Sequence, residues 1–131
     1  MASTDDNIPL TASKLSVLLV EDEALIRMMI AEMLKDLGYH VVAETSSIDD
    51  ALRLAETAKF DLALLDVNVA GSSIFPAADI VERRGLPLLF VSGYATTGLP
   101  EPFGSRGVLH KPFEIHRLKK AIDAVGVSRR R

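Results

Sequence analysis

The chain has 131 residues and a mass of 14.2 kDa, which is the common size of one domain. Its hydrophobic fraction of 48% and charged fraction of 25% exclude a disordered or collagen-like chain. The net charge of −3 argues against nucleic acid as a direct partner, the absence of cysteine excludes disulfides and thiolate catalysis, and no apolar run approaches the roughly 20 residues of a membrane-spanning helix. We therefore expect a soluble, cytoplasmic domain.

Short apolar runs alternate with helix-like periodic segments along most of the chain. The apolar runs predict five strands, at residues 16–20, 40–44, 61–65, 87–91 and 108–111. The periodic segments predict helices that begin near Leu25, Ser47, Pro76 and Ile115 and end near Gly38, Ala58, Gly85 and Gly126. Residues 1–13 have no period and are expected to form a flexible leader, residues 14–126 the domain, and residues 127–131 a basic tail.

The alternation of strands and helices predicts the fold class. Near-continuously apolar strands are typical of a parallel sheet covered on both faces, so we expect an α/β, doubly wound, flavodoxin-like fold with five parallel strands. Residues 92–107 break the alternation, because they contain four glycines and two prolines. A long loop with a shortened or irregular fourth helix is expected there.

Polar side chains gather where the predicted strands end. Glu21 and Asp22 follow the first strand, Asp66 the third, Ser92 the fourth and Lys111 the fifth. These ends share one edge of a parallel sheet, where ligands bind in such folds. Three carboxylates and a single ammonium leave surplus negative charge, which suits Mg²⁺ with its preference for oxygen ligands. Taken singly, each residue is equally an ordinary turn or helix-capping residue.

Four short segments combine these residues into one recognisable set. They are Val20-Glu21-Asp22-Glu23, Asp66-Val67-Asn68, Ser92-Gly93-Tyr94 and Lys111-Pro112-Phe113. With them the chain resembles, over residues 14–126, the receiver domain of two-component response regulators. More narrowly, it resembles single-domain receivers with a Thr/Ser-Gly-Tyr motif, a subgroup associated with histidine kinases of the HWE/HisKA2 type.

The resemblance implies a phosphoacceptor and a magnesium site. Asp66 corresponds to the aspartate that takes a phosphoryl group from a phosphohistidine on the kinase. Asp22 corresponds to a direct Mg²⁺ ligand beside Asp66, and Glu21 to an acid that acts through water. Asn68 corresponds to the residue whose backbone carbonyl completes the metal site.

The resemblance also implies a switch. Lys111 corresponds to the lysine that pairs with the phosphoryl oxygens, and Ser92 to the hydroxyl that moves to bond the phosphate. Gly93 leaves space beside the phosphate, Tyr94 and Asn68 flank the path of an attacking water, and the peptide bond before Pro112 is typically cis.

Three positions depart from the family pattern. Ala70 and Ile74 stand where a proline and a glycine are common, so we expect a different loop after Asp66. Val108 replaces the usual aromatic switch residue, and Tyr94 either takes over that role or is a static surface residue. Residues 94–106 are predicted to become ordered on phosphorylation.

The sequence therefore predicts a stand-alone response regulator, not an enzyme, that signals through protein partners with neither membrane nor nucleic acid involved. A phosphate sink for a shared kinase is a variant of this function. An aspartate-dependent phosphohydrolase and a flavodoxin-like cofactor binder are alternatives of other classes. Met28, Met29 and Met33 have helical spacing and are expected in the core or facing a partner.

Overall fold

A computed structural model describes residues 15–93, 99, 103 and 107–126. Its main feature is a five-stranded parallel sheet with the strand order β2-β1-β3-β6-β7. The strands are β1 (Ser16–Val20), β2 (His40–Thr45), β3 (Leu62–Asp66), β6 (Leu88–Ser92) and β7 (Val108–His110). The predicted fold class is confirmed, and each predicted strand is present within one or two residues of its expected bounds.

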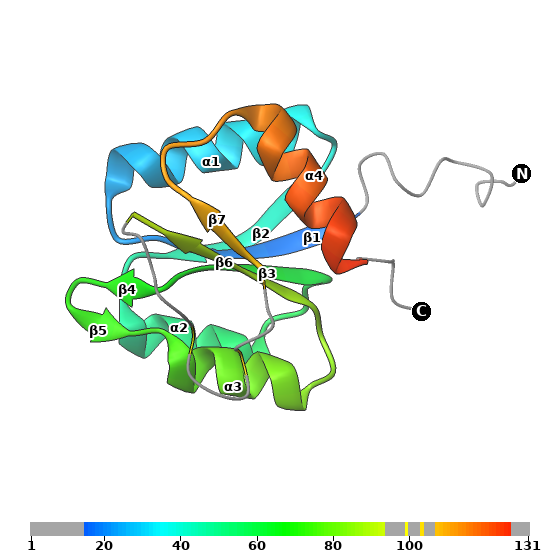
Figure 1. The fold of residues 1–131 in the computed structure, drawn as a ribbon. Helices are drawn as coiled ribbons and strands as arrows, with labels where there is room; N and C mark the ends of the chain where they lie inside the picture. The colour runs from blue at the N-terminus through cyan, green and yellow to red at the C-terminus, as the bar shows by residue number, and fades with distance from the viewer. Residues whose placement is uncertain (1–14, 94–98, 100–102, 104–106, 127–131) are drawn as a thin grey trace, which may run out of the picture.

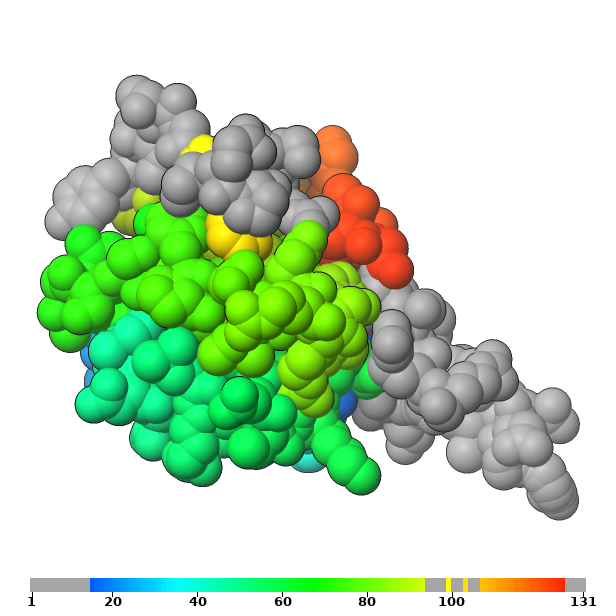
Figure 2. All heavy atoms as spheres, turned by 90° about the horizontal axis from the view of Figure 1, so that it is seen from below, coloured from blue at the N-terminus to red at the C-terminus, as the bar shows by residue number. Residues whose placement is uncertain are grey.

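Four helices are found in the described part of the chain, two on each face of the sheet (Figure 1). They are α1 (Ala24–Asp36), α2 (Ile48–Thr57), α3 (Phe75–Arg83) and α4 (Ile115–Val125). Helices α1 and α4 cover one face, and α2 and α3 cover the other, where their side chains form a continuous layer (Figures 1 and 2). No helix in these described ranges combines the length and apolarity needed to cross a membrane.

The helix ends follow the signals in the sequence. Ser47 caps α2 with its hydroxyl, which accepts a hydrogen bond from the Asp50 N–H at 3.1 Å. Pro76 lies in the first turn of α3. Gly126 ends α4 in the left-handed conformation, with φ of 71°. Local chemistry thus places three of the four helices before any tertiary contact is considered.

The sheet separates two hydrophobic layers. Strand β3 lies in the middle of the sheet and is buried along its whole length. Its alternate side chains point to opposite faces, and helices cover both faces. Leu62 and Leu64 pack in the layer under α1 and α4, while Ala63 and Leu65 pack in the layer under α2 and α3. The apolar runs in the sequence reflect this two-sided burial.

The register aligns the carboxyl ends of the strands. Val20 pairs with Leu65, Asp66 with Val91, and Ser92 with His110. Four strands from distant parts of the sequence, β1, β3, β6 and β7, therefore end at one edge of the sheet. That edge holds the polar side chains described below.

A small β-hairpin after β3 was not predicted. Its strands are β4 (Asn68–Val69) and β5 (Ser72–Ser73), joined by Ala70 and Gly71. Both turn residues have positive φ, 51° and 88°, as two-residue hairpin turns of type I′ require. The loop after Asp66, where the sequence departs from the family pattern at Ala70, is thus a hairpin in this chain.

Between β6 and β7 the structure describes Gly93, Leu99, Phe103 and Gly107. Phe103 is buried, and its ring packs against Phe75 and Phe90 with centroids 5.6 and 5.4 Å away. The predicted irregular fourth helix and the predicted ordering of residues 94–106 lie largely outside the described residues, as does Tyr94. The predicted leader, residues 1–13, and the predicted basic tail, residues 127–131, also lie outside the described residues.

Candidate functional site

Five predicted site residues come together at the carboxyl edge of the sheet. Glu21 and Asp22 follow β1, Asp66 ends β3, Ser92 ends β6 and Lys111 follows β7. Glu21, Asp66 and Ser92 are buried, with exposed fractions of 1%, 5% and 3%. Asp22 is half-buried. Parallel strands therefore collect buried charge at a single place, as the strand-end pattern predicted.

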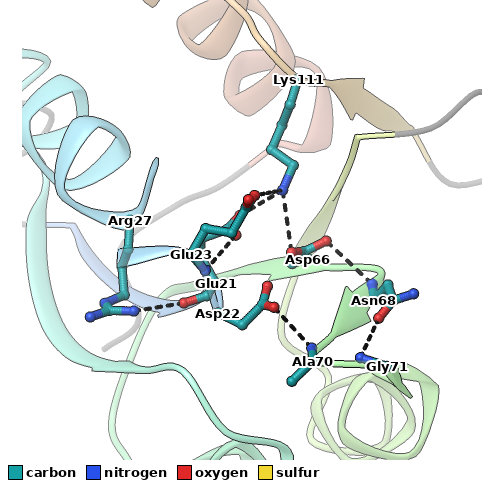
Figure 3. Close-up of polar contacts among 9 residues, drawn as sticks. All are labelled: Glu21, Asp22, Glu23, Arg27, Asp66, Asn68, Ala70, Gly71 and Lys111. Atoms are coloured by element: carbon teal, nitrogen blue, oxygen red, sulfur yellow. Dashed lines mark hydrogen bonds and ion pairs between the residues drawn. The ribbon is translucent and has the colours of Figure 1, made fainter. Parts of the chain in front are cut away.

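Lys111 is the cation at the centre of this edge (Figure 3). Its Nζ donates to Glu21 Oε1 at 3.0 Å and to Asp66 Oδ2 at 3.3 Å, and lies 3.8 Å from Glu23 Oε1. Its backbone N–H donates to the Ser92 carbonyl at 2.8 Å, which extends the β6–β7 pairing to the site. The Lys111–Pro112 peptide bond is cis, as the family resemblance implied.

The charges at this edge are not balanced. Burial, and then the charge of Glu21, raise the pKa of Asp66 to about 7, although the Lys111 ammonium and the Asn68 N–H act to lower it. Burial alone would lower the pKa of Lys111, but its hydrogen bond to Glu21 and the charge of Asp66 outweigh burial and raise it. One ammonium therefore does not satisfy the carboxylates around it.

The carboxylates fit a divalent metal ion. Glu21, Asp22 and Asp66 each offer an oxygen, and these oxygens lie within 4.8 Å of one another. An all-oxygen donor set with excess negative charge is what Mg²⁺ prefers. The raised pKa of Asp66 agrees with this, because burial and then the charge of Glu21 disfavour its ionised form, which a bound cation would stabilise. Among the described residues, this is the one acidic group close enough to hold a metal.

Asn68 lies beside these carboxylates at the start of β4. Its backbone N–H donates to Asp66 Oδ1 at 3.2 Å. Its side-chain oxygen accepts from the Gly71 N–H at 2.8 Å, so that oxygen is used inside the hairpin. The role of its backbone carbonyl as a metal ligand, and its role along a water path, stay predictions.

Gly93 follows the buried Ser92 and lies against Lys111. A Cβ added to Gly93 would meet Lys111 Cε at 3.5 Å, which is ordinary contact. A larger side chain would extend from that point into the space around the lysine. The role of Gly93 in leaving space beside the phosphate and the motion of the Ser92 hydroxyl both stay predictions.

Two residues, Arg27 and Ala70, make contacts at the site that were not predicted. The Arg27 guanidinium donates to the Glu21 backbone carbonyl at 2.9 Å and pairs with Glu44 at 3.2 Å. The Ala70 N–H donates to Asp22 Oδ2 at 3.0 Å. Arg27 has a weak sequence signal, as a basic residue one turn into the helix after an acidic strand end. The Ala70 contact spans 48 residues and has no signal in the sequence.

The site opens into a cleft of about 740 Å³. One wall of the cleft is formed by the acidic residues, Asn68 and Lys111, and the other by apolar side chains of α1 and the β7–α4 connection. These apolar residues are Ile26, Met29, Ile30, Met33 and Phe113. The charged edge is therefore reached through a partly apolar opening.

Comparison with known proteins places this arrangement in a family. The model of the response regulator receiver domain matches residues 17–123. Transcriptional regulatory protein PdtaR of Mycobacterium tuberculosis is 40% identical over 117 residues, which are 86% of this chain and 57% of PdtaR. The chain thus spans somewhat more than half of that relative.

Solved structures agree with this match. The solution structure of SdrG from Sphingomonas melonis Fr1 has a TM-score of 0.76 and 32% identity, and covers 90% of this chain and 98% of SdrG. The receiver domain of the histidine kinase PA1611 from Pseudomonas aeruginosa, solved with magnesium coordinated in its active-site cleft, has a TM-score of 0.73 and 25% identity, with coverage of 85% and 96%. The chain belongs to the family of response regulator receiver domains.

Proposed function

We propose that a histidine kinase transfers a phosphoryl group to Asp66, and that the altered surface signals to a protein partner. One observation carries this proposal: the buried Asp66 carboxylate lies 3.3 Å from Lys111 Nζ, with the Glu21 and Asp22 oxygens close enough to share a metal ion. Family membership favours this function over the phosphohydrolase and flavin-binding alternatives.

The chemistry follows from the groups in place. A carboxylate oxygen of Asp66 forms a bond to phosphorus, the bond from phosphorus to the kinase imidazole breaks, and the electron pair of that bond stays on the imidazole nitrogen. In such transfers the protein contributes mainly positioning and charge neutralisation. Lys111 lies where it can pair with a phosphoryl oxygen. Bound Mg²⁺, held by Asp22, Asp66 and the Asn68 carbonyl with Glu21 behind water, would neutralise the remaining charge.

The surface next to the cleft supports delivery by a protein. Leu25, Met28 and Met29 of α1 are 70%, 62% and 50% exposed, which is unusual for large apolar side chains. Met29 also lines the cleft that leads to Asp66. Of the two readings for the methionines, the partner-facing one fits Met28 and Met29. The Ser92-Gly93-Tyr94 motif supports a kinase of the HWE/HisKA2 type.

Phosphorylation by a small phosphodonor tests the proposal without the kinase. The protein is incubated with acetyl phosphate and Mg²⁺, and its intact mass is measured. We expect one added phosphoryl group in the wild type and none in Asp66→Asn or after chelation of the metal. Asp79→Asn is the matched control, because Asp79 is an exposed aspartate paired with Arg83 far from the site. A full mass increment in Asp66→Asn would contradict the proposal.

A further inference from the structure

The β4–β5 hairpin connects two carboxylates of the site through backbone N–H groups (Figure 3). At its start, the Asn68 N–H donates to Asp66 Oδ1 at 3.2 Å. At its turn, the Ala70 N–H donates to Asp22 Oδ2 at 3.0 Å. One short element therefore contacts the aspartate at the end of β3 and the aspartate after β1.

The turn is held in place by the Asn68 side chain. Its oxygen accepts from the Gly71 N–H at 2.8 Å, a local contact that asparagine makes readily in turns. Ala70 has φ of 51°, a conformation that residues with a Cβ rarely adopt. In this conformation its N–H meets Asp22, so the turn geometry and the contact to Asp22 depend on each other.

The donor to Asp22 is neutral, which matters for a cation site. A backbone N–H fixes the orientation of a carboxylate without cancelling its charge, whereas a lysine at the same place would compete with a metal ion. Lys111 contacts Glu21 and Asp66, and the structure gives it no bond to Asp22. One oxygen of Asp22 is thus held by a donor that carries no net charge.

We infer that the Ala70–Gly71 turn, set by the Asn68 side chain, is a positioning element that holds Asp22 in place for the metal ion. This inference rests on the proposed function, because it takes Asp22 as a metal ligand. Partners that orient metal ligands typically contribute tenfold or more to metal affinity. Asn68 therefore has a side-chain role that is separate from its backbone carbonyl.

The first test is Mg²⁺ affinity, measured by isothermal titration calorimetry without any phosphodonor. Asn68→Ala removes the acceptor for the Gly71 N–H and should weaken Mg²⁺ binding about tenfold. Asn68→Ser keeps a shorter acceptor and should recover part of the affinity. Ala70→Gly keeps the N–H, relieves the positive φ, and should bind within about twofold of the wild type. Rescue by serine distinguishes positioning from a general loss of structure.

The second test examines the hairpin contact in metal-free protein by amide hydrogen exchange. The Ala70 N–H should be protected in the wild type and exchange at least about tenfold faster in Asp22→Ala, while the Ala63 N–H in β3 keeps its protection. An Ala70 N–H that exchanges equally fast in both proteins would overturn the inference.

The outcomes separate the two proposals. Equal Mg²⁺ affinity in the wild type and Asn68→Ala would overturn the positioning role alone, because the metal site would stand without it. A wild type that binds no Mg²⁺ would overturn the proposed metal site, and the positioning role with it.

Discussion

Strand β3 has a buried aspartate at each end, and the two differ in what surrounds them. Asp61, just before the strand, accepts hydrogen bonds from the Ser16 N–H at 2.8 Å and the Ser16 hydroxyl at 3.1 Å. Asp66, at the other end, lies among Glu21, Asp22 and one lysine. The bonds from Ser16 to Asp61 join β1 to the start of β3, whereas Asp66 lies in unbalanced charge.

The comparison shows which end of β3 carries the unbalanced charge of the site. Burial is similar, with exposed fractions of 8% for Asp61 and 5% for Asp66. At Asp66, burial first and then the charge of Glu21 raise the pKa to about 7, although the Lys111 ammonium acts to lower it. A carboxylate held in this way is stabilised by a nearby cation.

The largest effect is expected for Lys111→Met. Removing the ammonium leaves the buried Glu21 and Asp66 carboxylates without their cation, and we expect the metal-free protein to lose about 3 kcal/mol of unfolding free energy. Urea denaturation measures this loss, and saturating Mg²⁺ should restore part of it. A stability equal to that of the wild type would show that the carboxylates are not strained by charge.

Neutralising the aspartate at one end of β3 or at the other should change the free energy of unfolding in opposite directions. Asp66→Asn removes a strained charge and should stabilise metal-free protein at pH 8 by about 2 kcal/mol. Asp61→Asn weakens the hydrogen bonds to Ser16 and should destabilise it by about 1 kcal/mol. Denaturation of both variants against the wild type gives the comparison, and two losses of similar size would remove the contrast.

The same contrast predicts a pH dependence. The pKa of Asp66 is about 7 in the folded protein, above its ordinary value of 3.8, so between these values the folded state binds the extra proton. Stability from this group therefore falls as pH rises towards 7, and the loss is complete above it. Denaturation of metal-free protein from pH 5 to pH 8 should show a decline that Asp66→Asn lacks. Equal slopes for both proteins would refute the assignment to Asp66.

A smaller effect is expected for Arg27→Ala. The guanidinium loses its hydrogen bond to the Glu21 carbonyl and its ion pair with the half-exposed Glu44, and we expect a loss of about 1 kcal/mol. Arg27→Lys keeps a charge without the two-sided contact and should be intermediate. Thermal denaturation orders the three proteins by stability. Equal stability of Arg27→Lys and Arg27→Ala would mean that the charge at this position contributes nothing.

The smallest effect is expected at the hairpin turn. Ala70 has φ of 51°, which glycine adopts without the steric cost of a Cβ. Ala70→Gly should therefore stabilise the protein by about 0.5 kcal/mol. A destabilised variant would show that the alanine methyl makes a contact worth more than the backbone strain.

Much of this organisation was predictable because it is local and repetitive. Two-sided burial gives β3 its apolar sequence, and the Ser47 cap marks the start of α2 before any tertiary contact. The strand-end rule then places Asp66 and Lys111 at one edge, although they are far apart in sequence. The same rule chooses Asp66 over Asp61, since only one end of a parallel strand lies at the ligand edge.

The β4–β5 hairpin and the contacts of Ala70 and Arg27 could not be predicted, because such features leave no pattern in the sequence. The β4–β5 hairpin requires positive φ at Ala70. An alanine in the sequence does not indicate positive φ, whereas glycine or asparagine would. The Ala70 N–H donates to Asp22, and the Arg27 guanidinium donates to the Glu21 carbonyl. Both contacts use backbone atoms, which every residue has. Backbone partners are chosen by the tertiary fold, and side-chain identity does not reveal them.

The most direct measurement identifies the modified residue chemically. The protein is treated with acetyl phosphate and Mg²⁺, reduced with borohydride, which converts an acyl phosphate of aspartate to homoserine, and mapped by peptide mass spectrometry. We predict homoserine at position 66 and at no other aspartate, with Asp61 unmodified as the internal comparison. Homoserine at another position, or an unmodified Asp66 in protein that binds Mg²⁺, would contradict the account.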